Sequence, residues 1–323
     1  MSVVEVMLRE KFSIGALWKP IIITIIAMFV IGILATYLAL VPLFIYFTFT
    51  SGNISGAIDS ASFNFDSMWG QTLHQLLQNA GFVLIVLILL RGSKLPFLDR
   101  LSMGNLREAP KQFFSGVGIE IVLFLLPIGV AILLGVVAIQ EYGFTNAGMA
   151  GVAISTVLIL IQTLSIGIGE EVLARGYLQR TLTDRYGIAF ALPVAAMVFA
   201  LLHIPTIFIG GSQNPVTIVT IFVSALIFGY LFYKTGSLWI CIGLHFATDF
   251  FNSQVISGMS GYAPFFAISQ LTPILPSAPW LGDWINIILT GFYIIAFLVI
   301  ILYYRHRGPA KPGSVVGDPS LKA

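Results

Sequence analysis

The sequence predicts an all-α polytopic membrane protein with about eight transmembrane helices, and three observations support that class. Only 9% of the 323 residues are charged and 58% are hydrophobic, whereas roughly a quarter of the residues in ordinary globular chains are charged. The mean hydropathy is +0.96. A water-soluble fold of this size needs far more charge to cover its surface. Apolar stretches long enough to cross a bilayer follow one another along the chain.

A spanning helix needs about 20 apolar residues. The stretches that fit cover residues 20–48, 71–90, 114–139, 148–169, 188–204, 215–233, 237–256 and 284–304, within a residue or two. We expect the fourth to continue to about residue 184. The first is too long for the apolar part of a cleaved signal peptide. We therefore interpret it as a retained helix, kinked or extended near Pro42.

The positive charges predict the orientation of these helices. All 16 Lys and Arg residues lie in the N-terminal segment, in the 91–113 loop, after the fourth and sixth stretches, and in the C-terminal tail. The alternate loops contain none; these are 50–70, 140–147, 205–214 and 257–283. Because Lys and Arg favour cytoplasmic loops, we expect both termini to be cytoplasmic. The proline-rich 257–283 segment is then an extracytoplasmic loop.

Composition also excludes some functions. The net charge is only +2 and there is no basic run, which argues against a nucleic-acid partner. A single cysteine, Cys241, excludes a disulfide framework and a cysteine-based zinc cluster. The chain also shows no internal repeat.

Ionisable side chains within the predicted helices are the candidate functional residues. Each costs at least about 2.5–3.5 kcal/mol at the centre of a membrane helix, so such residues usually mark a functional site. They are Glu120, Glu170, Glu171, Arg175, His203, His245 and Asp249. Most fall into three short patterns on three helices.

The first pattern contains adjacent glutamates. Glu171 and Arg175 are four residues apart, in the order that favours an ion pair on one helix face. That pair could be purely structural. Glu170 points about 100° away from it and has no such partner, so Glu170 is the residue that still needs an explanation.

The other two patterns contain histidines. His203 lies one turn after Phe199 and could be a packed core histidine. His245 and Asp249 are again four residues apart, and they could satisfy each other, bind a metal or stabilise charge. Taken singly, neither pattern establishes a function.

The three patterns are predicted to lie at similar depths in the membrane. Glu170 and His203 are nearly equidistant from the turn at Gly187, so both lie roughly 24–26 Å along their helices from it. His245 and Asp249 lie roughly 14 and 20 Å from the turn between the sixth and seventh helices. These levels overlap, so the sequence predicts that the four residues share one polar cavity.

Such a set can perform hydrolysis. A carboxylate beside an imidazole, as in Glu170 with His203, can hold and deprotonate a water molecule. His245 with Asp249 can stabilise an oxyanion. Alternatively, all four could bind one Zn²⁺ that activates the water. The zinc-protease motif HExxH is absent, and Cys241, four residues before His245, leaves a weaker thiolate alternative.

The three patterns resemble the motifs of the CPBP intramembrane proteases, which include the type II CAAX prenyl endopeptidases and Abi-like bacterial relatives linked to bacteriocin maturation and immunity. The family motifs EExxxR, FxxxH and HxxxN/D lie in this order on successive membrane helices. Here they are Glu170, Glu171 and Arg175; Phe199 and His203; and His245 and Asp249, and the resemblance covers about residues 150–255.

The resemblance implies a role for each motif residue. Glu170 and His203 activate the attacking water, and His245 and Asp249 stabilise the oxyanion. Glu171, Arg175 and Phe199 support them. Many family members have Asn where this chain has Asp249. An ionised Asp249 cannot donate a hydrogen bond, so it would be protonated, orient His245 or touch a metal. A metal-dependent and a metal-free glutamate mechanism both suit these residues.

We therefore expect an intramembrane endopeptidase that cleaves a membrane-anchored or lipid-modified, CAAX-type protein in a prokaryotic cell membrane. Its expected organisation is helices 1–3 in residues 1–149, the catalytic core with helices 4–7 in 150–256, and a loop, the last helix and a flexible cytoplasmic tail in 257–323. One alternative is an ion- or proton-coupled transporter, in which Glu120 could belong to the translocation path. The other is a non-catalytic membrane scaffold.

Overall fold

The computed structural model describes residues 14–51, 53–92, 96–205, 215–256, 265–270 and 284–308. Within them, six helices are long and apolar enough to cross a membrane. They are Leu17–Thr50, Met68–Leu89, Ala109–Leu133, Ala147–Tyr186, Pro215–Thr235 and Trp284–Tyr304. Apolar side chains are exposed along their outer faces. The protein is an integral multi-pass membrane protein.

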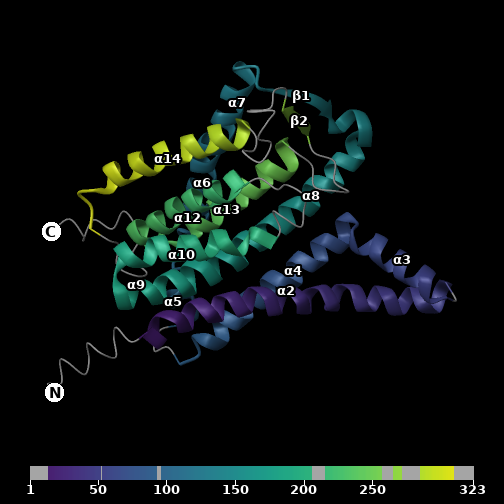
Figure 1. The fold of residues 1–323 in the computed structure, drawn as a ribbon, viewed down its shortest axis with the longest axis horizontal. Helices are drawn as coiled ribbons and strands as arrows, with labels where there is room; N and C mark the ends of the chain where they lie inside the picture. Colours follow the sequence, from purple (N-terminus) through teal and green to yellow (C-terminus); the bar gives the residue numbers. More distant parts are fainter. Residues whose placement is uncertain are drawn as a thin grey trace.

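Figure 1 labels the elements in chain order. The first half contains α2 (Ile14–Ser51), α3 (Ile54–Phe65), α4 (Met68–Leu89), α5 (Phe97–Arg100), α6 (Ala109–Glu120), the π-helix η1 (Ile121–Leu125), α7 (Leu126–Leu133) and β1 (Val137–Tyr142). The second half contains α8 (Gly143–Glu171), the π-helix η2 (Val172–Gln179), α9 (Arg180–Tyr186), α10 (Ile188–Leu202), α12 (Pro215–Thr235), α13 (Leu238–Phe250), the π-helix η3 (Phe251–Ile256), β2 (Phe266–Gln270) and α14 (Trp284–Tyr304).

Each of the eight predicted apolar stretches contains a helix. The fifth is α10, which is apolar but only 15 residues long. The seventh combines the 13 residues of α13 with the 6 of η3. Figure 1 shows that α2 begins and α14 ends at the same end of the molecule. The number of helices that cross the membrane, and the side on which the termini lie, stay predictions.

The first helix is continuous. α2 has 38 residues and keeps its helical form through Pro20 and Pro42, so its length of about 57 Å far exceeds a hydrocarbon core of about 30 Å. The prediction of an extended helix at Pro42 is confirmed. Asn53 then caps the short helix α3, because its side chain accepts a hydrogen bond from the Gly56 amide at 2.6 Å.

The predicted end of the third helix is wrong. The helix ends at Leu133 rather than near residue 139, since Gly135 adopts a φ of 67° that a helix cannot continue. The following residues form β1, which pairs antiparallel with β2. This two-stranded sheet was not expected in an all-α chain, and it joins two of the loops predicted to be extracytoplasmic. Apart from residues 265–270, the predicted 257–283 loop lies outside the described residues, as do the 206–214 segment, Arg9, Lys11 and the tail beyond residue 308.

The predicted extension of the fourth helix is confirmed. α8, η2 and α9 follow one another without interruption to Tyr186. Gly187, with a φ of 78°, then turns the chain into α10, and Gly236, with a φ of 64°, separates α12 from α13. These are the two turns from which the depths of the four polar residues are predicted.

Small residues allow α13 to pack closely against two helices. A Cβ atom at Gly116 of α6 would overlap the carbonyl oxygen of Ile240, and one at Gly243 would overlap that of Phe113. A Cβ atom at Gly167 of α8 would lie 3.1 Å from the carbonyl oxygen of Ile242. Glycine therefore permits contact between the backbones of α6, α13 and α8. The contact with α8 brings its C-terminal end beside the histidine of α13.

The central helices form the hydrophobic core. Buried side chains of η2, α12 and α13, such as Leu173, Ile227 and Ile242, pack together within it. Figure 1 shows α10, α12 and α13 in the middle of the molecule, with α14 on one side and α2 and α4 on the other. The polar residues predicted to share a cavity lie within this surrounding apolar structure.

Candidate functional site

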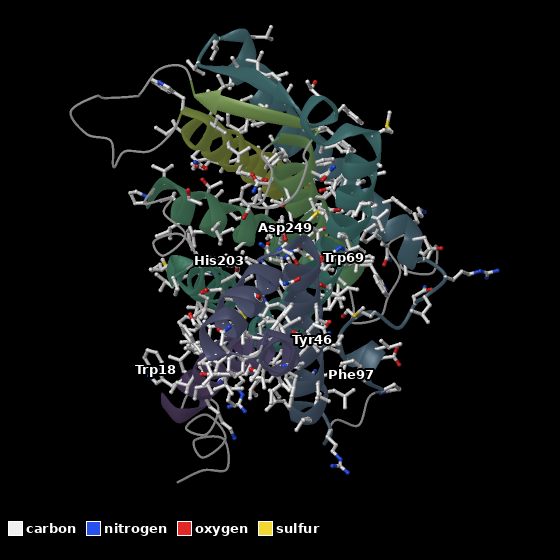
Figure 2. All side chains as sticks on the ribbon, turned by 90° about the vertical axis from the view of Figure 1, so that its right-hand side faces the viewer. Trp18, Tyr46, Trp69, Phe97, His203 and Asp249 are labelled. Carbon is white, nitrogen blue, oxygen red and sulfur yellow. The ribbon has the colours of Figure 1, made fainter. Side chains whose placement is uncertain are left out.

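The structure brings the predicted polar residues together from three helices. Glu170 comes from the end of α8, His203 caps the C-terminus of α10, and His245 and Asp249 lie on α13. Oε2 of Glu170 lies 3.9 Å from Nε2 of His203 and 3.8 Å from Nε2 of His245. Figure 2 shows His203 and Asp249 toward the centre of the molecule, with Trp18 at its periphery. The four residues that were predicted to share a polar cavity therefore lie close together in the structure.

His203 is oriented by its own helix. Its Nδ1 lies 2.8 Å from the carbonyl oxygen of Phe199. A carbonyl oxygen can only accept, so Nδ1 carries the proton of this hydrogen bond. The other nitrogen, Nε2, consequently faces Glu170. The Phe199 ring packs against the imidazole with 4.7 Å between the centroids.

His245 is held by carboxylates on both sides. Its Nδ1 lies 2.8 Å from Oε1 of Glu171, so Nδ1–H donates to that carboxylate. Its Nε2 lies 3.5 Å from Oδ2 of Asp249 and faces Glu170. Helical spacing predicts only the pairing of His245 with Asp249 on the same helix. The contact between His245 and Glu171 could not be predicted, because spacing along one helix carries no information about a partner on another.

The Glu171–Arg175 ion pair predicted from helical spacing is confirmed, at 2.5 Å. Both side chains are almost completely buried. The guanidinium also donates to the carbonyl oxygen of Ala225 at 3.4 Å and lies over the rings of Phe199 and Phe228, 4.5 and 5.3 Å from their centroids. Cation–π contacts of this kind stabilise a desolvated guanidinium. Phe228 was not identified from the sequence.

Side-chain exposure increases across the site. Glu171 is 0% exposed, Glu170 15%, His203 25% and Asp249 31%. The site is therefore closed at Glu171 and most open at Asp249. Beside Glu170 lies a small, mainly apolar pocket between α2, η2 and α10, whose walls include Thr24 and Leu202.

Three π-helical segments lie next to acidic residues of this region. η1 begins directly after Glu120, η2 directly after Glu171, and η3 two residues after Asp249. A π-helical turn widens the helix and changes the direction in which neighbouring side chains point, and such turns occur frequently at functional sites. Helical spacing at 3.6 residues per turn could not predict these side-chain directions.

Glu120 lies behind the site rather than in it. It is completely buried, and the hydroxyl of Tyr293 from α14 donates to its Oε1 at 2.5 Å. The sequence leaves a place in a transport path open for Glu120, and the structure gives its side chain a hydrogen-bond partner, Tyr293.

The arrangement does not form a ready metal site. Two imidazoles and two carboxylates are donors that Zn²⁺ accepts. Within the ranges that the structure describes, however, no group of three or more His, Cys, Asp or Glu side chains is arranged to hold a metal ion. Cys241 is fully buried, and its thiol donates to the carbonyl oxygen of Phe228 at 3.2 Å, so its position gives no support to the thiolate alternative.

Part of the chain is similar to a known protein family. Residues 151–251 match the family model described as type II CAAX prenyl endopeptidase, Rce1-like. The match covers less than half of the chain and includes every residue of the three motifs. It confirms the resemblance inferred from those motifs. No curated protein and no solved structure matches the chain.

Proposed function

We propose that this chain is an intramembrane endopeptidase that hydrolyses a peptide bond of a membrane-anchored or lipid-modified, CAAX-type protein in a prokaryotic cell membrane. One observation carries the proposal. A carboxylate oxygen of Glu170 lies within 3.9 Å of imidazole nitrogens from two other helices, His203 and His245, inside a multi-pass membrane protein. The family match over residues 151–251 supports the same reaction class.

Glu170 and His203 would activate the attacking water. Their separation of 3.9 Å exceeds a direct hydrogen bond and suits two groups that share one water molecule. The Glu170 carboxylate would accept a proton from that water as it attacks the peptide carbonyl. His203, whose Nδ1–H is engaged by Phe199, presents Nε2 to the same water. This is general-base catalysis.

His245 would stabilise the tetrahedral intermediate. Its Nδ1–H donates to Glu171, which fixes the ring so that Nε2 faces the open part of the site. An Nε2–H in that position would donate to the oxyanion. Asp249, 3.5 Å away, would orient Nε2 or, when protonated, donate directly. Preorganised donors of this kind act strongly where water is excluded.

The proposal is tested with Glu170→Gln, which preserves size and removes basicity. The substrate is a farnesylated peptide ending in a CAAX sequence, and the released C-terminal fragment is measured by mass spectrometry on purified protein in proteoliposomes. Loss of a general base lowers the rate by about 10²–10⁴-fold. His203→Gln should show a similar loss, whereas Glu108→Gln, at the partly exposed start of α6, should cleave normally.

Two results would contradict the proposal. Full cleavage by Glu170→Gln would remove the proposed base. Failure of the wild-type protein to cleave either the farnesylated peptide or its unmodified counterpart would remove the substrate class. A non-catalytic scaffold predicts full biological activity of Glu170→Gln in cells, and a transporter predicts proton flux across vesicles without any substrate cleavage.

A further inference from the structure

A second pocket lies outside the Glu170 site, near the beginning of α2. It lies between α2, the last turn of α4 and the η2–α9 segment, and its volume is about 230 Å³. Its walls include Lys19, Ile23, Leu89, Tyr177, Thr181 and Arg185. None of its wall residues takes part in the proposed hydrolysis.

Among the described residues, only positively charged side chains bring charge to this pocket. Lys19 and Arg185 come to it from different helices, and no acidic side chain lines it. Neither cation forms an ion pair with a described residue, although the neighbouring Asp184 pairs with Arg100 at 3.1 Å. A concave site to which the described residues bring two cations and no acidic side chain favours an anion.

Hydroxyl groups accompany the two cations. Tyr177 and Thr181 contribute them to the same wall, one turn apart. Tyr177 is only 8% exposed, and it lines the pocket together with Arg185. A phosphate group would thus meet two cations and two neutral donors, a combination suited to its several acceptor oxygens.

An exposed apolar face of α2 that begins at Lys19 suits an acyl chain. Lys19 is the first residue of a stripe along one face of α2, at intervals of three and four residues. The stripe continues through Ile22, Ile26, Phe29 and Ile33, which are 48%, 54%, 50% and 55% exposed. Trp18, 51% exposed, stands beside Lys19, and tryptophan prefers the level of the lipid headgroups. The pocket therefore lies where headgroup and hydrocarbon meet.

We propose that this pocket binds an anionic phospholipid. Its phosphate lies between Lys19 and Arg185, the hydroxyls of Tyr177 and Thr181 donate to it, and an acyl chain follows the exposed stripe of α2. The bound lipid joins α2 to the helical segment that carries Glu171 and Arg175. This binding site is independent of the proposed proteolysis, because its evidence and its test involve no cleavage.

The test measures lipid retention by the full-length purified protein. Delipidated protein is titrated with dioleoylphosphatidylglycerol or dioleoylphosphatidylcholine, and bound lipid is counted by native mass spectrometry. Each basic residue near an anionic lipid contributes about 1 kcal/mol, so the pair should give a preference of about tenfold or more for phosphatidylglycerol. The double variant Lys19→Ala/Arg185→Ala should lose that preference.

A second pair of substitutions, outside the pocket, distinguishes a specific lipid-binding site from general electrostatic attraction of anionic lipid to the protein surface. Arg91→Ala/Arg107→Ala removes the same charge from exposed positions outside the pocket and should keep the preference. Lys19→Arg, which retains the charge, should keep it too, and Tyr177→Phe should reduce it while leaving the thermal unfolding temperature nearly unchanged. If the double variant does not fold, Lys19→Ala alone should lower the preference at least about threefold.

Three outcomes would overturn the proposal. Equal losses in the pocket pair and the second pair would mean diffuse surface attraction. Displacement of phosphatidylglycerol by an equal concentration of glycerol 1-phosphate would mean a soluble anion site. Displacement by the free carboxylate of an unmodified peptide, but not of its C-terminal amide, would mean a peptide-binding site.

Discussion

Oε1 of Glu171 on α8 lies 2.8 Å from Nδ1 of His245 on α13, 74 positions further along the chain. The same oxygen pairs with Arg175 at 2.5 Å. Helical spacing alone explains the Glu171–Arg175 ion pair as structural. In the structure, Glu171 is also in direct contact with His245, the proposed oxyanion donor. Glu171 both neutralises a buried guanidinium and orients an imidazole, and these two effects can be separated by mutation.

Glu171→Gln should impair both stability and cleavage. It leaves the Arg175 guanidinium buried without a counter-charge, which in soluble proteins costs about 3–5 kcal/mol of unfolding free energy. It also weakens the hydrogen bond that orients His245. We expect a lower thermal unfolding temperature in detergent and a cleavage rate lowered at least about tenfold.

The double variant Glu171→Gln/Arg175→Gln separates the two effects. Removing both charges leaves no unpaired ion, so much of the stability should return. Cleavage should stay low, because His245 still lacks its carboxylate partner. Recovery of cleavage together with stability would show that Glu171 acts only through folding.

The role of Asp249 is tested by comparing an amide with an apolar side chain. Asp249→Asn keeps a hydrogen-bonding group 3.5 Å from Nε2 of His245 and can donate to an oxyanion, so cleavage should stay within about tenfold of wild type. Asp249→Leu removes the polar group and should lower the rate by about 10²–10³-fold, the typical cost of one oxyanion donor. Equal losses in both variants would mean that the carboxylate itself is required.

Metal dependence can be measured directly. The described His, Cys, Asp and Glu side chains form no group of three arranged to hold a metal ion, whereas protein-bound Zn²⁺ needs N or O ligands at about 2.0–2.2 Å. We expect 1,10-phenanthroline to leave the cleavage rate unchanged and elemental analysis to find far less than one metal ion per chain. The non-chelating 1,7-phenanthroline is the control. Inhibition by the chelator alone, reversed by Zn²⁺, would establish a metalloprotease.

Local patterns in the sequence predicted the elements that depend on them. Apolar stretches located the helices, Gly187 and Gly236 marked their turns, and the spacing of Glu171 and Arg175 predicted their ion pair. These features depend on residues close together in the chain or on the length of an apolar run. Equal depth also predicted that Glu170 and His203 would meet, because antiparallel helices place equidistant residues at one level.

Contacts between distant parts of the chain and irregular backbone conformations could not be predicted from local sequence patterns. The strand after Gly135 pairs with residues more than 120 positions away, and an apolar run such as Val137–Ile139 is compatible with either a helix or a strand. The π-helical turn after Glu171 changes side-chain directions that regular helical spacing assumes constant. The hydrogen-bond partner of Glu120 is Tyr293 on α14, and nothing near Glu120 in the sequence indicates this contact.

The contact between Glu120 and Tyr293 leads to the last prediction. Tyr293→Phe removes the hydroxyl that donates to a completely buried carboxyl group. Leaving such an acceptor unsatisfied costs about 1–3 kcal/mol of unfolding free energy. Glu120→Gln keeps a carbonyl acceptor for Tyr293 and removes a buried ionisable group, so it should cost less than Tyr293→Phe or even stabilise the protein. Thermal unfolding of purified protein in detergent measures both effects.

Substitution of an exposed tyrosine is the control for this comparison. Tyr303 lies on the same helix, α14, and is 60% exposed, so Tyr303→Phe should leave the unfolding temperature unchanged. A Glu120→Gln variant less stable than Tyr293→Phe would mean that the negative charge itself is needed. If Glu120 belonged to a proton path, Glu120→Gln would instead abolish proton flux in vesicles at unchanged stability. A structural role predicts the opposite, because the hydrogen bond from Tyr293 then matters to folding and not to transport.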